Sequence, residues 1–173
     1  MTQCTDKFSN FLRVFFILGI LIIASSILLR EALAAEYEAG LEAVQKEDYK
    51  TALRKWKPLA EAGNSDAQFG LGYMYLQGKG VVLNYKRAMN WFRLAAEQGD
   101  PDAQNNLGLM YAVGSGVVED PVYALMWFNL AASAGSEGAK KNIVASEEIL
   151  SKFDQKEAKE MAMKCKEKKY KGC

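Results

Sequence analysis

The sequence contains no histidine, and it has few cysteines and prolines, three of each. Without histidine the chain lacks the usual general base near neutral pH and the commonest ligand of transition metals. The three cysteines, Cys4, Cys165 and Cys173, form no C-x-x-C pair, so zinc and thioredoxin-type chemistry are poorly supported. The formal net charge is +1, which predicts no attraction to nucleic acid. We therefore expect no metal, no cofactor and no nucleic-acid partner.

Only one long apolar run is present, from Val14 to Leu29, and the basic residues Lys7 and Arg13 precede it. The small-residue pattern A-x-A follows at 32–34, as at a signal cleavage site. Together these features predict a secretory signal peptide over residues 1–34, cut after its last residue. The alternative is an uncleaved N-terminal anchor, although the run is shorter than the roughly 20 residues that a span needs. Both interpretations place the rest of the chain outside the cytoplasm, in the periplasm or the medium.

The rest of the chain is dominated by a repeat. Residues 63–98 align with residues 99–134 without a gap, which makes the period 36 residues. In both copies the first half reads A-Q-x-x-L-G-x-M-Y-x-x-G-x-G-V, and the second half contains an alanine, a Trp-Phe pair and a Leu-Ala-Ala triplet. A fixed period of this length indicates a stack of identical helical units.

Each copy predicts two helices separated by a glycine-rich turn. The first begins near Ser65, where Gln68 completes a capping-box pattern, and in the second copy near Pro101. The second helix begins after Asn84 or Asp120, which are good N-cap residues. We expect its buried stripe to consist, in the first copy, of Ala88, Trp91, Phe92 and Ala95.

The flanks extend the pattern in weaker form. Residues 35–62 are expected to form an atypical first helix pair, and residues 135–150 a closing helix. Residues 151–173 then hold a C-terminal helix, from Gln155 to about Lys166, and a cysteine-containing tail. Terminal repeats depart from the pattern because one of their sides faces water.

The repeated motifs resemble the Sel-1-like repeat, a relative of the tetratricopeptide repeat, well over residues 63–146 and loosely over 36–62. The resemblance implies an all-α fold, an α-solenoid of antiparallel helix pairs that we expect to form a right-handed superhelix. It also implies an adaptor or scaffold rather than an enzyme, one that binds a protein or peptide partner. Many bacterial members of the family are exported, which agrees with the signal peptide.

Two other functions stay open. The first is a cell-envelope enzyme or binder that acts on peptidoglycan or β-lactams. Family members linked to such roles carry a cysteine pair in each repeat, whereas this chain has no cysteine in its repeats. The second is a spacer component of an export or exopolysaccharide assembly.

The partner is expected on the concave surface that the first helix of each pair lines. On this surface, some inward positions are not needed for packing between helices. These positions differ between the two copies, as expected for residues that are free to vary. They are Phe69, Tyr73 and Gln77 in one copy and Asn105, Leu109 and Val113 in the other. Phe69 and Tyr73 lie four residues apart and so share a helix face. In an alternative interpretation Phe69 belongs to the core and only Tyr73 is exposed.

Cys165 and Cys173 are expected to form a disulfide, because Cys4 leaves with the signal and one pair remains in an oxidising compartment. A continuous helix would hold the two about 12 Å apart, so the helix must end between them, and Gly172 is available for the return. A free thiol pair or intermolecular bonds are the alternative.

Overall fold

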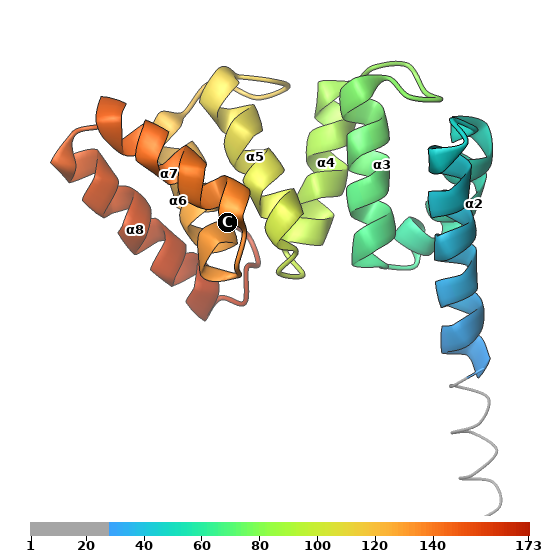
Figure 1. Cartoon of the computed structure of the whole chain (residues 1–173). Coiled ribbons are helices and arrows are strands. Elements are labelled where there is room, and N and C mark those ends of the chain that lie inside the picture. Colours follow the sequence, from blue (N-terminus) through green and yellow to red (C-terminus); the bar gives the residue numbers. More distant parts are fainter. Residues whose placement is uncertain (1–27) are drawn as a thin grey trace, which may run out of the picture.

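The computed structural model describes residues 28–173, and this part of the chain is helical without any strand (Figure 1). The predicted signal segment falls largely on residues 1–27, which lie outside the described residues. Within the described part, none of the helices combines the length and hydropathy that a membrane span requires. A first helix covers residues 28–45, and it is followed by α2 (Tyr49–Glu61), α3 (Ser65–Gln77), α4 (Tyr85–Ala96), α5 (Pro101–Val113), α6 (Pro121–Ser133), α7 (Glu137–Ile149) and α8 (Lys152–Glu167).

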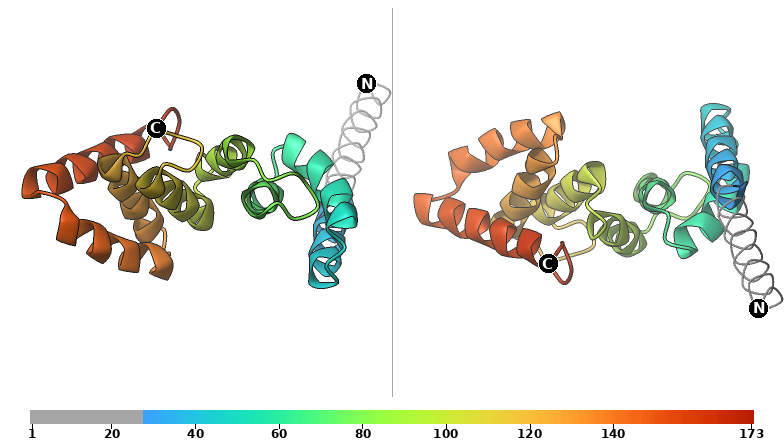
Figure 2. Two further views of the ribbon diagram at one scale, coloured as in Figure 1. Left: turned by 90° about the horizontal axis from the view of Figure 1, so that it is seen from above. Right: turned by 90° about the horizontal axis from the view of Figure 1, so that it is seen from below.

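The helices pack in chain order as antiparallel pairs. The helix 28–45 pairs with α2, α3 pairs with α4, and α5 pairs with α6, while α2 against α3 and α4 against α5 join one pair to the next. Figure 2 shows the row from above and below, with the helix 28–45 at one end and α7 and α8 at the other. The architecture is therefore the predicted α-solenoid. The C-terminal tail reaches beyond the neighbouring unit, because Lys171 pairs with Glu97 after α4 at 3.7 Å.

The helix starts follow from N-capping side chains. The predicted caps Asn84 and Asp120 are confirmed, since each accepts a hydrogen bond from a backbone N–H three residues on. The capping box that starts at Ser65 is wrong. Asn64 caps α3 instead, because its extended backbone lets Oδ1 accept from Ala67 N at 2.7 Å. Gln68 is buried and its Nε2 donates to Ala60 O of α2 at 3.0 Å, so it joins two helix pairs.

Within each pair, a glycine of the first helix lies directly under an aromatic ring of the second. A Cβ on Gly72 would stand 2.6 Å from the ring of Phe92, and a Cβ on Gly108 would stand 2.4 Å from the ring of Phe128. These distances are shorter than van der Waals contact, so any larger residue at either position would have to displace the ring. The repeated Gly and Phe thus set the distance between the two helices of a unit.

The expected buried stripe of α4 is correct at three of four positions. Ala88, Phe92 and Ala95 are fully buried, but Trp91 is partly exposed. Its counterpart Trp127 in α6 is fully buried, and α6 packs against α5, α7 and α8, whereas α4 packs mainly against α3 and α5.

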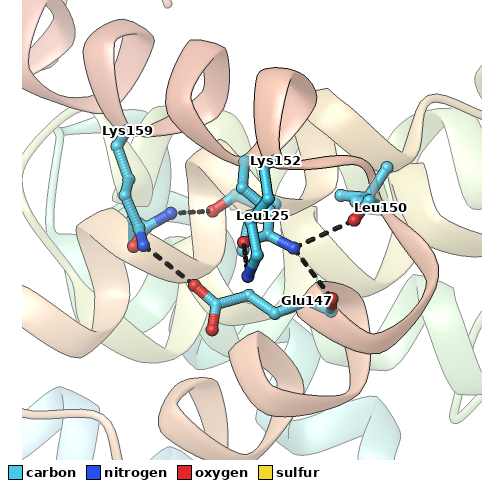
Figure 3. Close-up of polar contacts among 7 residues, drawn as sticks. Leu125, Glu147, Leu150, Lys152 and Lys159 are labelled. Atoms are coloured by element: carbon cyan, nitrogen blue, oxygen red, sulfur yellow. Dashed lines mark hydrogen bonds and ion pairs between the residues drawn. The ribbon is translucent and has the colours of Figure 1, made fainter.

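The C-terminal helix begins at Lys152, three residues before the predicted start, because Ser151 caps it and accepts from Asp154 N. Lys159 of α8 and Glu147 near the end of α7 point toward each other where the two helices meet (Figure 3). The side chain of Gln155 also joins α8 to the end of α7. Its Nε2 donates to Glu147 O at 2.8 Å and to Leu150 O at 2.9 Å. Lys159 adds an ion pair with the Glu147 carboxylate at 2.9 Å. These bonds hold α8 against the C-terminal end of α7.

The predicted disulfide between Cys165 and Cys173 is present, with the two Cα atoms 5.6 Å apart. The helix ends between them, as expected, but the return uses more than Gly172. Lys169 and Tyr170 also have positive φ angles, which makes the reversal tight. The tail is bound to the repeat as well, because Tyr123 Oη donates to Cys173 O at 2.5 Å.

We predict that Gly108→Ala lowers the free energy of unfolding by about 1–3 kcal/mol, because the new methyl group overlaps the Phe128 ring. Gly138→Ala is the matched control, since Gly138 also lies in a helix but its Cβ would meet nothing closer than 3.8 Å. The control is expected to be neutral or slightly stabilising, because alanine favours helix. Urea denaturation of both variants measures the difference, and equal stabilities would contradict the Gly–Phe contact.

We also predict that reduction of the disulfide lowers stability by up to about 2.5 kcal/mol in the chain-entropy model for a nine-residue loop. Thermal melting with and without dithiothreitol measures the effect. The variant Cys173→Ser serves as the control, because its melting temperature should match that of the reduced protein and should not respond to the reductant. If dithiothreitol does not change the melting temperature of the native protein, the disulfide contributes nothing to its stability.

Candidate functional site

The first helix pair and α3 enclose a small apolar pocket of about 130 Å³. The helix 28–45 and α3 form its sides, and α2 closes it between them. Its walls are aromatic and aliphatic, and one lysine comes from the turn after α3. The lining residues are Tyr37, Leu41, Val44, Tyr49, Trp56, Phe69, Gly70, Tyr73, Met74 and Lys79.

Trp56 forms the buried wall of this pocket. Its indole fits between two glycines: a Cβ on Gly40 would stand 2.1 Å from the ring and a Cβ on Gly70 2.6 Å. The indole Nε1 donates to Tyr37 O at 3.1 Å, and the ring of Tyr37 stacks on it with centroids 5.7 Å apart. A buried side chain held on both faces and by a hydrogen bond keeps one rotamer, so this wall is pre-formed.

Lys79 is held at the mouth of the pocket by the turn that ends α3. Gly78 caps α3 in the left-handed conformation, and Gly80, also with positive φ, lies against Tyr49. Lys79 Nζ thereby stands 5.4 Å from the ring centroid of Tyr49 and 5.8 Å from that of Tyr73. Such distances permit cation–π attraction to both rings.

The electrostatics of the pocket rest on this one cation. Lys79 is the single charged residue of the lining, and no ion pair within residues 28–173 includes it. Burial, together with the carboxylates of Asp66, Glu38 and Asp100, raises the pKa of Tyr37. The Tyr37 hydroxyl therefore stays protonated at neutral pH and keeps a hydrogen to donate.

Two of the six predicted partner-binding residues lie in this pocket. Phe69 is half-buried and its ring centroid lies 5.7 Å from that of Phe92, so it belongs partly to the core. Tyr73 is 43% exposed and faces the mouth with Lys79. Gln77 is exposed one turn further along α3 and is not part of the lining.

The three predicted residues of the second copy lie outside the pocket. Leu109 and Val113 are exposed on α5. Asn105 is partly buried, and its Oδ1 accepts from Asn142 Nδ2 of α7 at 2.9 Å, so this side chain already holds the closing helix. The two copies therefore differ in environment as well as in sequence.

Sequence reasoning missed the residues that the first helix pair contributes, namely Tyr37, Leu41, Val44 and Tyr49. One signal was present: position 70 is glycine where the second copy has Asn106. A glycine at one repeat position indicates a large neighbour close by, and that neighbour is Trp56. The described residues contain no cluster of three or more acidic or cysteine side chains suited to a metal ion.

Comparison with known proteins agrees with this architecture. The model of the Sel1 repeat matches residues 65–100 and 101–136. The chain is 31% identical to a protective antigen of uropathogenic Escherichia coli strains that displays an SLR fold, with a TM-score of 0.74 over 80% of this chain. It covers 31% of that antigen, so it spans about a third of the length of that relative.

A second solved structure is a Sel1 repeat protein from Oxalobacter formigenes, 35% identical with a TM-score of 0.60. The match covers 65% of this chain and 88% of that one. None of the curated proteins matches the sequence. The repeat motif, the helix-pair stack and the coverage of this second relative agree, and the chain belongs to the Sel1 repeat family.

Proposed function

We propose that the protein is an exported adaptor that binds a peptide segment of a partner protein along the first helices of its repeats. Proteins built from Sel1 repeats typically mediate protein–protein interaction, and the scaffold is generally non-catalytic. The observation that carries the proposal is the pre-formed apolar pocket with Tyr73 and Lys79 at its mouth. The anchor of the partner is one apolar side chain that enters this pocket.

The size of the pocket supports a side-chain anchor. Its volume of about 130 Å³ lies well below the 300–1,000 Å³ typical of small-molecule sites. Aromatic walls that are already rigid reduce the entropy lost on binding, and tyrosine and tryptophan are frequent among energetically dominant interface residues. Gln77, Leu109 and Val113 extend the exposed surface along α3 and α5 and are the proposed contacts for the neighbouring residues of the partner.

Lys79 adds a preference for acidic partners. Its ammonium group has no carboxylate partner among residues 28–173, and an aspartate or glutamate beside the anchor would supply one. Such an exposed ion pair contributes on the order of 0.2–1 kcal/mol and is screened by salt. The pocket lining contains no carboxylate, serine or cysteine, so it offers no support to the hydrolase alternative.

Export is supported by where the packing of the chain begins. Residues 28–36 are exposed, and the first tertiary contacts are the ion pair of Glu36 with Lys55 at 2.8 Å and the stacking of Tyr37 on Trp56. Cleavage after Ala34 would therefore remove no buried residue of the described part. The disulfide between Cys165 and Cys173 also suits an oxidising compartment.

We predict that the mature protein, purified from its native host, begins at or near Ala35. Mass spectrometry of the intact protein and of its N-terminal peptide provides the test. A protein that retains residues 1–34 and remains with the membrane fraction would instead support the N-terminal anchor.

We predict that Tyr73→Ala weakens partner binding at least tenfold, about 1.4 kcal/mol or more, because the mouth of the pocket loses its exposed ring. The partner is first captured from the cell envelope with the native protein, and affinities are then measured by calorimetry. Phe153→Ala on α8 is the matched control, since Phe153 is 74% exposed and lies outside the pocket. If both variants keep their fold and bind like the native protein, the pocket is not the binding site.

A further inference from the structure

The outer face of α4 is the repeat equivalent of a surface that is covered elsewhere in the molecule. One period separates Arg87, Asn90, Trp91 and Leu94 of α4 from Tyr123, Met126, Trp127 and Leu130 of α6. On α6 this face is covered by α8, whose Met161, Ala162 and Cys165 lie beside Tyr123, Met126 and Leu130. The repeat thus offers the same helix face twice, once occupied and once open.

The exposures of equivalent residues measure the difference. Leu130 is 2% exposed and Leu94 is 45% exposed, although both are leucines at the same repeat position. Trp127 is fully buried, whereas Trp91 is partly exposed and lines a hollow of about 350 Å³. The lining of this hollow is Lys57, Tyr75, Arg87, Asn90, Trp91 and Leu94. On α6, the equivalent leucine lies beside Ala162 and Met163 of α8.

We infer that the outer face of α4 is a second docking surface, which binds an acidic amphipathic helix of a partner protein. This surface is separate from the inner pocket, because the two sets of lining residues have no member in common. The internal precedent is α8 on α6, where small and flexible side chains of α8 lie beside Tyr123, Met126 and Leu130.

The preference for an acidic helix follows from the two positions at which the faces differ. Where α6 has Tyr123 and Met126, α4 has Arg87 and Asn90, so the α4 face carries one additional cation. Lys57 of α2 also lines the hollow, but it pairs with Glu61 at 3.9 Å and its repeat equivalent is the basic Arg93. Arg87 is oriented by Tyr75: its guanidinium lies 5.5 Å from the ring centroid, and Nη1 donates to the tyrosine hydroxyl at 3.3 Å. An oriented guanidinium matches a carboxylate, so the partner helix carries acids beside its apolar residues.

The same charges exclude a second copy of α8 as the occupant. The helix α8 carries lysines on the side that borders α6, including Lys159, Lys164 and Lys166. On α4 these lysines would approach Arg87 and Lys57, and like charges in contact are unfavourable. The open face therefore selects against the helix that covers its equivalent.

The experiment uses two synthetic peptides of the α8 sequence, residues 152–167 with Cys165→Ala. In the acidic peptide the three lysines at 159, 164 and 166 are changed to glutamate, and the second peptide keeps them. Fluorescence anisotropy of labelled peptides is measured against the full-length protein with its disulfide intact. We expect saturable binding of the acidic peptide, at least tenfold tighter than that of the lysine peptide, and a decrease in affinity with rising salt.

Trp91→Ala and Arg87→Glu are each expected to weaken binding of the acidic peptide at least tenfold, whereas Tyr73→Ala leaves it unchanged. Because Trp91 is partly buried, Leu94→Glu is included as a variant at a largely exposed position, with the same expected loss. Absence of saturable binding, or binding that these variants leave intact, overturns the proposal. The proposal is also overturned, in favour of an acidic glycan, by the following result: the acidic peptide does not bind, polygalacturonate binds the native protein, and Trp91→Ala abolishes the binding of polygalacturonate.

Discussion

The close contact between glycine and an aromatic ring determines the spacing of this solenoid. Gly72 under Phe92 and Gly108 under Phe128 repeat the same contact one period apart, and a side chain at either glycine would have to displace the ring. Because a helix pair cannot bury its apolar side alone, this contact fixes each unit and the buried alanines then let the next unit approach. The ring of Trp56 makes the same kind of close contact with Gly40 in its own helix pair and with Gly70 in the next one. This ring forms one wall of the pocket at the first helix pair.

The regular part of the fold could be predicted from the sequence because the signals are local. Caps such as Asn84 and Asp120 and glycine stops such as Gly78 act within one helical turn, so reading them requires no tertiary information. The error at Ser65 has the opposite cause. The side chain of Gln68 donates a hydrogen bond to the carbonyl of Ala60 in the preceding helix pair, and the pattern S-x-x-Q does not reveal this contact.

The candidate site was less predictable because it depends on contacts between units that differ from each other. Periodicity gives the shared face of Phe69 and Tyr73, but the pocket needs Tyr37 and Tyr49 from a helix pair that matches the repeat poorly. In the second copy the equivalent surface is altered by α7, which takes Asn105 into a hydrogen bond. A repeat sequence therefore predicts which positions share a helix face, and the neighbouring unit determines what those positions contact.

The two tryptophans of the repeat show how the same motif can serve either the core or a surface. Trp127 is fully buried, whereas Trp91 is partly exposed and borders a hollow that no described helix fills. Two neighbouring positions also differ, since α4 has Arg87 and Asn90 where α6 has Tyr123 and Met126. Three of the 22 basic and two of the 21 acidic residues lie in segment 1–34, which leaves 19 of each in the remainder. Because the remainder has no net charge, we propose that partner choice depends on cations beside apolar hollows: Lys79 at the pocket of the first helix pair, and Arg87 with Lys57 at the hollow on α4.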